Sequence, residues 1–259
     1  MVWRLPELVK EKGSQVNGDI TVDPFSISNI SSSVVSLAKS SVLYSERDSA
    51  NYIYVVRRGL CFSFRHDEEG RRQIIDLAFP GDFVGLEALT QPHYVCSLSA
   101  LNHSELVAYA VDDFTQQCYA EPALSRALVE CIAREQAILK KRLVGVAHSS
   151  ASRRIAHFLL EVRLRALAAG KLYPVGHNEL SPERNGQPVL RDEGFKLKLP
   201  QAVIADTLGL SIVHVSRTLG KLKEDGLIEY CSAGLRFTDL EGLKELALWE
   251  GLSPWFEPV

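Results

Sequence analysis

The chain has 259 residues, of which 46% are hydrophobic, and a net charge of −3. This length and composition predict one large or two ordinary globular domains, and the charge excludes a grossly basic nucleic-acid coat protein. No segment approaches the roughly 20 apolar residues that cross a bilayer, and residues 1–14 lack the apolar centre of a signal peptide, so we expect a cytoplasmic protein.

Residues 1–30 are mostly polar and form an N-terminal arm to which we assign no function. Short runs of alternating hydrophobicity then follow each other between Val34 and Asp113, separated by glycine-containing turns. The runs lie at residues 41–44, 52–56, 60–64, 73–77, 98–100 and 106–110. Many short strands at such spacing predict an antiparallel β-roll of the jelly-roll kind over residues 31–120.

Helical spacing dominates next, and residues 121–148 are predicted to form one long helix. Its apolar seam has spacings of three and four residues and has to be buried somewhere. We expect the seam to pair with its copy in a homodimer, rather than to be buried wholly in its own chain. The polar Glu135 and Arg142 either fix the register of this pairing or lie at its edge. The expected dimer interface consists of Leu124, Leu128, Cys131, Glu135, Ile138 and Arg142.

The C-terminal domain is predicted to cover residues 149–259, with its boundary near residues 145–152. It opens with a helix over residues 152–169, which Gly170 is expected to stop. Residues 171–193 contain three prolines and form a long loop that is either mobile or inserted. Residues 195–199 alternate as a short strand that leads into the next helices.

The strongest functional signal lies at residues 199–230. After a run with helical spacing at residues 202–208, Gly209 can adopt the left-handed conformation that ends a helix. Ser211 can then cap a second helix that extends to about Glu224. Two helices joined by so short a turn predict a helix-turn-helix. The inward-facing residues of its second helix are expected to be Ile212, Val215, Leu219 and Leu222.

Residues 227–231 and 235–237 alternate on either side of a turn and predict a β-hairpin wing. The wing argues against a mere pair of amphipathic helices. In a winged helix-turn-helix the second helix enters the major groove of DNA, where Arg217 can fork onto guanine. Basic residues upstream, at 140–142 and 153–154, could meet phosphates. The expected DNA-contacting residues are Ser211, Val213, His214, Ser216, Arg217 and Lys221.

This order of elements, with several short motifs, resembles the Crp/Fnr family of bacterial transcription regulators over about residues 35–240. The motifs are Tyr52-Ile53-Tyr54-Val55-Val56 with Gly59, Pro80-Gly81-Asp82-Phe83-Val84-Gly85, Arg154-Ile155-Ala156 with Phe158-Leu159-Leu160, and Ile204-Ala205-Asp206 leading to Val215-Ser216-Arg217-Thr218-Leu219. The resemblance implies a cyclic nucleotide-binding-like domain and a homodimer on a two-fold symmetric operator. It also implies RNA polymerase as a partner.

Departures from the family's patterns argue against two of the signals that family members sense. Cyclic-AMP-binding members carry a Glu soon after Gly-Asp-Phe and an Arg-Ser pair for the phosphate, but here Leu86 follows Gly85 and the pair falls on Tyr94-Val95. A cyclic phosphate would therefore lack its counter-charge. Oxygen-sensing members hold an iron–sulfur cluster on N-terminal cysteines, and no cysteine precedes Cys61.

Two further positions differ from family members. Haem-binding members place Cys and His where this chain has Gly85 and Glu87. His93 or Cys96 remain alternative haem ligands, but lone His and Cys residues in a β-domain are far more often structural, so we expect structural roles for both. Many members read cytosine with a Glu where this chain has Val213, which can offer only apolar contact, for instance to a thymine methyl group.

We predict no cofactor, and the effector stays unknown. The β-domain is either a sensor or a scaffold without a ligand, and a non-specific apolar filling of its pocket is equally consistent with the sequence. In the sensor version, a ligand between the β-domain and the long helix shifts the two DNA-binding domains from a mismatched to a matched spacing. The tentative pocket residues are Gly81, Gly85, Leu86, Glu87, Tyr94, Ile132, Glu135 and Leu139.

Two other functions compete with DNA reading. A ligand-binding regulatory module acting on a protein partner would keep its function when Arg217 is replaced by Ala. A cupin-like metal enzyme would need clustered ligands, whereas His66, His93 and His103 are isolated, so we expect no enzyme. The five cysteines have no CxxC spacing, which is typical of reduced buried thiols.

Overall fold

The computed structural model describes residues 27, 30–172, 199–231, 234–249 and 251. The loop expected after residue 172, nearly all of the N-terminal arm and most of the strand expected at 195–199 lie outside this part of the chain. The contacts divide the chain into two compact units, one ending at Gln136 and the next beginning at Ala137. The division falls inside a continuous helix, α2 (Pro122–His148).

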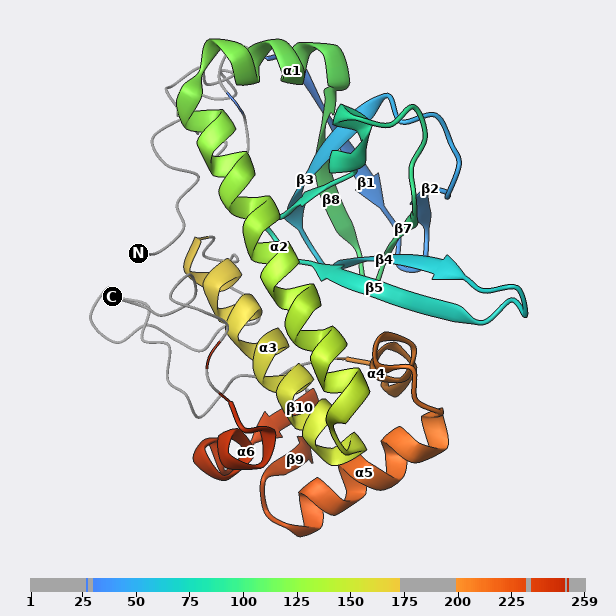
Figure 1. The fold of residues 1–259 in the computed structure, drawn as a ribbon, viewed down its shortest axis with the longest axis vertical. Coiled ribbons are helices and arrows are strands. Elements are labelled where there is room, and N and C mark those ends of the chain that lie inside the picture. The colour runs from blue at the N-terminus through green and yellow to red at the C-terminus, as the bar shows by residue number, and fades with distance from the viewer. Residues whose placement is uncertain (1–26, 28–29, 173–198, 232–233, 250, 252–259) are drawn as a thin grey trace. The chain divides into compact units, whose positions relative to one another are not determined.

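The first unit is built from two four-stranded antiparallel sheets, as predicted for this part of the chain (Figure 1). One sheet has the order β1 (Ser32–Leu37), β8 (Ser104–Ala110), β3 (Tyr52–Arg58) and β6 (Phe83–Val84). The other has the order β2 (Val42–Tyr44), β7 (Ser97–Ala100), β4 (Cys61–His66) and β5 (Arg72–Ala78). Ile53 and Val55 lie on one face of the first sheet, and Val56 and its partner Leu106 lie on the other. All four are fully buried, so both faces of this sheet are covered at this point.

The edge strand β1, Ser32–Leu37, was not among the strand runs predicted from the sequence, the first of which begins at residue 41. It pairs with β8 along its whole length, from Ser32 opposite Tyr109 to Leu37 opposite Ser104. Most of its side chains are exposed, with only Leu37 buried. An edge strand can therefore hold its place through main-chain hydrogen bonds without a hydrophobic alternation that the sequence would reveal.

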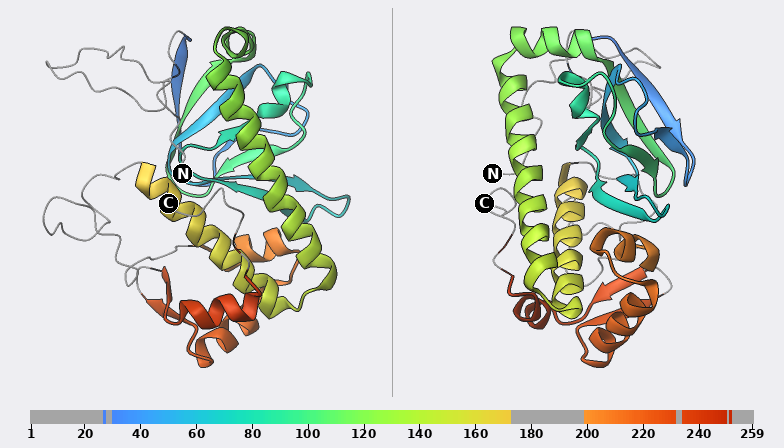
Figure 2. Two further views of the ribbon diagram at one scale, coloured as in Figure 1. Left: turned by 60° about the vertical axis from the view of Figure 1, so that its left-hand side comes forward. Right: turned by 45° about the vertical axis from the view of Figure 1, so that its right-hand side comes forward.

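Helices α1 (Val111–Ala120) and the first part of α2 lie along one side of the β-roll (Figures 1 and 2). Phe114 of α1 is fully buried, with its ring centroid 5.9 Å from that of Phe83. Arg134 of α2 donates a 2.9 Å hydrogen bond to Asp82, in the turn between β5 and β6. These contacts fix α2 on the β-roll up to Gln136.

The expected dimer seam of α2 is corrected by its burial. Leu124, Leu128, Cys131 and Ile138 are at most 8% exposed within a single chain, so they are not available to a second copy. The polar members are engaged as well, Glu135 with Cys131 and Arg142 with Glu161. The exposed apolar residues of α2 lie on other positions, at Val129, Ile132, Leu139, Leu143 and Val144.

The second unit contains α3 (Ala151–Leu172), α4 (Gln201–Leu208), α5 (Ile212–Glu224), β9 (Ile228–Cys231), β10 (Gly234–Phe237) and α6 (Leu240–Ala247). Helix α3 packs against α4, α5 and α6 and buries Ile155, Phe158 and Leu159. Gly170 does not stop α3, which continues to Leu172. A glycine costs about 1 kcal/mol in a helix interior and does not by itself break the helix.

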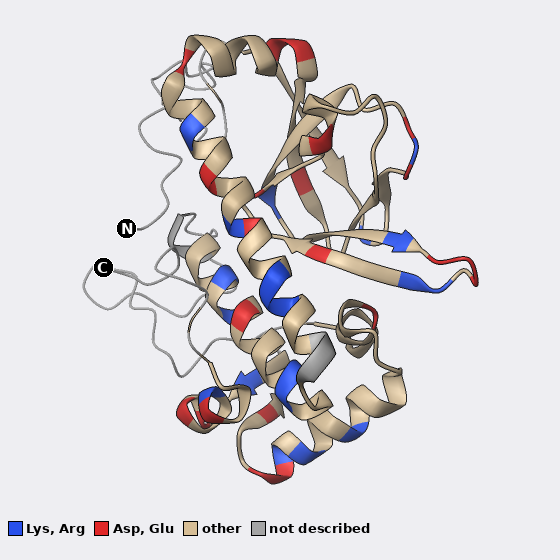
Figure 3. Cartoon of the chain, in the orientation of Figure 1, with Lys and Arg blue, Asp and Glu red and all other residues tan. Residues whose placement is uncertain are grey.

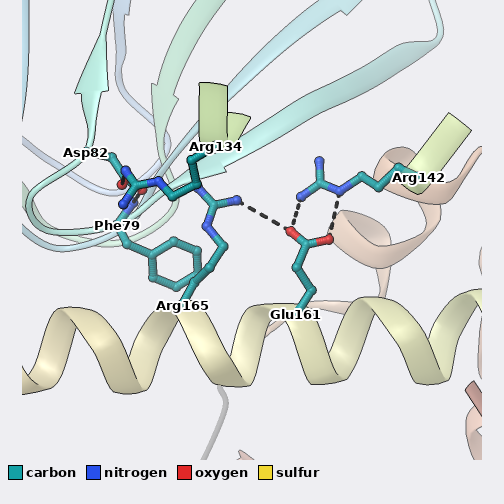
Figure 4. Close-up of polar contacts among 6 residues, drawn as sticks. All are labelled: Phe79, Asp82, Arg134, Arg142, Glu161 and Arg165. Carbon is teal, nitrogen blue, oxygen red and sulfur yellow. Dashed lines mark hydrogen bonds and ion pairs between the residues drawn. The ribbon is translucent and has the colours of Figure 1, made fainter. Parts of the chain in front are cut away.

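A buried ionic cluster joins the end of α2 to α3 (Figure 4). Glu161 accepts hydrogen bonds from Arg142 at 2.5 and 3.0 Å and from Arg165 at 3.4 Å. The three side chains are 11% exposed or less. Such a buried carboxylate requires these partners, because removing a charge from water is costly unless it is paired.

No single helix in the described ranges has the length and apolar character needed to cross a membrane. Only α4 and α5 taken together, as a pair bent by 111°, pass the same test of length and composition.

Candidate nucleic-acid interface

Helices α4 and α5 form the predicted helix-turn-helix. Gly209 closes α4 in the left-handed conformation at φ 60°, and the amide of Leu210 donates to the carbonyl of Ala205. The Ser211 hydroxyl caps α5 by accepting a 3.2 Å hydrogen bond from the His214 amide. The bend of 111° between the helices is in the range usual for this motif. Both expected turn residues are therefore confirmed in these roles.

The buried side of α5 holds it on α3 and α4. Val215, Leu219 and Leu222 are at most 1% exposed, as predicted, and they meet a similarly buried row on α4. Ile212 was also expected to face inward, which is wrong, because it is 55% exposed. It occupies the first turn of α5, where the helix projects beyond its neighbours, and Thr218 is buried instead.

The opposite side of α5 is open to solvent. Every residue assigned to DNA contact is exposed, namely Ser211, Val213, His214, Ser216, Arg217 and Lys221. Figure 3 shows basic residues along this helix. Within the described part of the chain, the Arg217 guanidinium makes no hydrogen bond or ion pair. A guanidinium without protein partners on an exposed helix face has all of its N–H donors available to a ligand.

The wing consists of β9 and β10, which pair antiparallel from Ile228 opposite Phe237 to Cys231 opposite Gly234. Arg236 and Glu229 face each other across it at 2.7 Å and are each 46% exposed. Ile228 and Leu235 are buried, which attaches the hairpin to the rest of the unit. The hairpin therefore packs on the same domain as the helix-turn-helix, and β9 contacts α5.

Three of the basic residues that precede the helix-turn-helix form hydrogen bonds or an ion pair within the protein. Arg154 donates through a terminal guanidinium nitrogen to the carbonyl of Leu208, at the end of α4. Lys141 donates to the carbonyl of Gly251, and Arg142 binds Glu161. Arg142, whose charge is paired with Glu161, is therefore not available to phosphates as expected, whereas Lys141 and Arg154 each use only one donor on a neutral carbonyl. Arg154 positions the helix-turn-helix by satisfying a carbonyl that a helix end leaves without a partner.

The tentative effector pocket is partly filled by the β-roll's own side chains. The Tyr94 ring lies against Gly85, where a Cβ atom would come within 3.1 Å of it. Tyr94 stacks on Tyr44 with ring centroids 3.7 Å apart and donates a 2.7 Å hydrogen bond to the carbonyl of Tyr52. Tyr94 is 3% exposed, and burial raises the pKa of its phenol well above the usual value.

The remaining pocket residues are dispersed. Gly81 lies at the β5–β6 turn with φ 94°, and Leu86 and Glu87 lie in the short 3-10 helix η1 (Leu86–Leu89). Ile132 and Leu139 are each 41% exposed on α2. Among the described residues, no group of three or more His, Cys, Asp or Glu side chains is placed to hold a metal ion.

The four cysteines with described side chains are free thiols, at positions 61, 96, 118 and 131. Burial raises the pKa of Cys61 to about 11 and that of Cys131 to about 12. The pKa of Cys96 is also raised to about 12, first by burial and then by the nearby Glu87 carboxylate. These thiols are protonated at neutral pH and are poor nucleophiles or metal ligands in that state.

Comparison with known proteins connects both units to recognised domain families. Residues 34–120 match the cyclic nucleotide-binding domain, and residues 153–246 match the Crp-like helix-turn-helix domain. The chain is 29% identical to the nitrogen fixation regulation protein FixK of Bradyrhizobium diazoefficiens, over 82% of this chain and 81% of that protein. It is 26% identical to the anaerobic regulatory protein of Haemophilus influenzae, over 81% of this chain and 74% of that protein.

Solved structures show the same fold. A CRP/FNR-family transcriptional regulator from Thermus thermophilus superposes with a TM-score of 0.62 at 25% identity, covering 85% of this chain and 100% of that one. FixK2 from Bradyrhizobium japonicum superposes with a TM-score of 0.68 at 22% identity, covering 84% of this chain and 98% of that one.

Proposed function

Because the chain belongs to the Crp/Fnr family of DNA-binding transcription regulators, we propose that it binds a two-fold symmetric operator as a homodimer and does so without cyclic AMP. The two copies of α5 enter successive major grooves, about 34 Å apart along the duplex. RNA polymerase as a partner and a place in the cytoplasm are part of the same proposal.

The exposed face of α5 is the observation that carries DNA reading. Arg217 is free to fork onto guanine O6 and N7, while His214 and Ser216 can bond base edges or phosphates. Val213 is 67% exposed and Ile212 is 55% exposed, so both can contact thymine methyl groups. The buried face and the Ser211 cap hold these side chains in a fixed geometry, and a rigid support is what specific reading requires.

The exposed stripe on α2 supports the homodimer. Val129, Ile132, Leu139 and Leu143 recur at spacings of three, seven and four residues, which are the a and d positions of a coiled coil. Their side chains are 41% to 71% exposed in the single chain. A second copy of α2, packed along this stripe, would remove an apolar surface from water.

The tyrosine cluster supports independence from cyclic AMP. Tyr94 stands at the position where the family pattern places the arginine for the cyclic phosphate, and its ring covers Gly85. Tyr94 brings no positive charge, and its hydroxyl is already used by the Tyr52 carbonyl. A cyclic phosphate placed there would have to displace a buried ring and would still lack its cation.

Selection of bound sequences from a random DNA pool tests this function with the purified, ligand-free full-length protein. We expect a palindromic motif, and we expect Arg217→Ala to lose about 1 to 3 kcal/mol of binding free energy and to relax one base position. Arg58→Ala, which removes an exposed arginine from strand β3 of the other unit, is the matched control and should recover the same motif.

Recovery of an unchanged motif by Arg217→Ala would contradict the assignment of α5 and favour action on a protein partner. Enrichment that requires added cyclic AMP would contradict the ligand-free part of the proposal. A motif without two-fold symmetry would contradict the homodimer.

A further inference from the structure

A small cavity lies inside the unit that begins at Ala137, away from the exposed face of α5. Its volume is about 50 Å³, and it is bounded by the last turns of α2, the first turns of α3 and the ends of α4 and α6. This volume has room for several water molecules or one tetrahedral oxyanion. The charged and titratable residues that line it are Lys141, Arg142, Arg153, Arg154, His157 and Glu161.

The lining carries more positive than negative charge. Its one carboxylate, Glu161, is already bound by Arg142 and by Arg165 from outside the cavity wall. Lys141 and Arg154 each donate to a neutral main-chain carbonyl, which does not cancel their charge. Positive charge from three further cations therefore remains without a counter-ion in a partly buried space.

The two adjacent arginines of the lining each have one unused hydrogen-bond donor. Among the residues that the structure describes, the Nε atoms of Arg153 and Arg154 have no hydrogen-bond partner, and both atoms are buried out of reach of solvent. Leaving a buried donor unsatisfied costs about 1 to 3 kcal/mol, and more when the group is charged. Adjacent arginines at the start of α3 thus offer paired charge-assisted donors to a ligand that is both anionic and rich in acceptors.

His157, in the wall of the cavity, is affected by burial and by charges of both signs. Burial lowers the pKa of His157, the positive charges of Lys141 and Arg142 lower it further, and Glu161 opposes them. A neutral His157 adds no charge to the lining, and its imidazole can still donate one hydrogen bond.

We propose that this cavity binds a small tetrahedral oxyanion, such as inorganic phosphate or the phosphate group of a small metabolite, between the guanidinium groups of Arg153 and Arg154. The anion neutralises the excess charge and accepts hydrogen bonds from the two guanidinium groups, whose buried Nε donors reach it only when the side chains move. Through Arg154 it is linked to the carbonyl of Leu208, which ends the helix before the turn that leads to α5.

Calorimetric titration of the full-length protein with inorganic phosphate, at constant ionic strength set by sodium chloride, tests the site. We expect saturation at one phosphate per chain and at least tenfold weaker binding by Arg153→Gln. Arg58→Gln, at an exposed arginine of β3, should bind as the unmodified protein does. Absence of saturable binding, or equal binding by both variants, would overturn the proposal.

A second measurement does not depend on how well a variant folds. The His157 resonances, assigned by comparison with His157→Gln, should report a higher pKa in phosphate than in chloride, because a bound anion stabilises the imidazolium. A His157 pKa that is the same in both anions would count against an occupant in this cavity.

The same phosphate chemistry could come from a free anion or from the backbone of DNA. Repeating the titration with operator DNA bound distinguishes them. Unchanged phosphate affinity identifies a free anion, and competition identifies a DNA phosphate. Phosphate binding without any operator binding would uphold this site while the proposed function fails, so the two failures are distinguishable.

Discussion

At the scale of single residues, Glu161 holds the end of α2 to α3. Replacing it with Ala leaves Arg142 and Arg165 buried without their carboxylate, so we expect a loss of about 3 to 5 kcal/mol in the free energy of unfolding, measured by urea denaturation. Asp67→Ala, which breaks a pair with Arg71 whose side chains are 41% and 71% exposed, should cost far less, because solvent screens an exposed ion pair. If both variants lose the same unfolding free energy, the buried pairing of Glu161 with Arg142 and Arg165 does not stabilise the protein more than an exposed ion pair does.

The buried thiols make a second residue-scale prediction. A thiol reacts with alkylating reagents as thiolate, and a pKa of about 12 at Cys96 and Cys131 lowers the thiolate fraction roughly a thousandfold relative to an ordinary cysteine. We expect both residues to resist iodoacetamide in the folded protein near neutral pH and to react once urea unfolds it. Mass spectrometry of peptides checks this. Fast labelling of Cys96 in the native protein would be inconsistent with its raised pKa.

Residues whose roles depend on the local chain were predictable. Gly209 and Ser211 act through main-chain conformation and a hydrogen bond three residues away, so the sequence around them contained the necessary information. Ile212 was misjudged and the role of Arg154 was missed, because their surroundings come from other elements. Arg154 meets the carbonyl of Leu208, 54 residues further along the chain, and no local pattern announces that contact.

At the scale of elements, α2 carries two apolar stripes, and only the folded chain shows which one is free. The first has spacings of three and four residues throughout, whereas the second has spacings of three, seven and four, so the sequence alone favoured the first. The stripe chosen first contains Leu124 and Leu128, and the structure buries it on the β-roll side. The exposed stripe at Val129, Ile132, Leu139 and Leu143 stayed unnoticed as a seam because Gln136 interrupts it.

The homodimer gives the prediction at this scale. Leu139→Asp places a charge in the middle of the exposed stripe, where pairing would bury it, so we expect the variant to sediment as a monomer. Tyr119→Asp is a matched control, since Tyr119 is 85% exposed on α1 and away from the stripe. A dimer that survives Leu139→Asp, or that is lost equally in both variants, would place the interface elsewhere. The operator affinity of Leu139→Asp should fall together with dimerisation.

At the scale of the whole molecule, buried tyrosines determine how the protein responds to alkaline pH. Burial raises the pKa of Tyr44, Tyr54 and Tyr94 in the β-roll, and that of Tyr230 in the wing. A group whose pKa is raised by folding contributes stability below its unfolded pKa and loses it above that value. We therefore expect the β-roll to lose stability as the pH rises above about 10.

Urea denaturation followed at about pH 8 and about pH 11 measures this loss, with ultraviolet absorbance reporting phenolate formation. Tyr94→Phe removes one of the buried phenols, so its denaturation midpoint should fall less with pH even if it starts lower. A midpoint with the same pH dependence in Tyr94→Phe would show that Tyr94 does not contribute to the alkaline loss.

The passage of α2 from one unit to the other without a loop sets a rule for rearranging this protein. A helix advances 1.5 Å and turns about 100° per residue, so a splice after Gln136 that adds or removes one residue turns the later residues of α2 by that angle against the earlier ones. Val129 and Ile132 precede this point and Leu139 and Leu143 follow it, so such a splice would break the exposed stripe into two faces of the helix. Chimaeras joined at this point should therefore dimerise in a periodic manner, with seven-residue insertions tolerated far better than insertions of two.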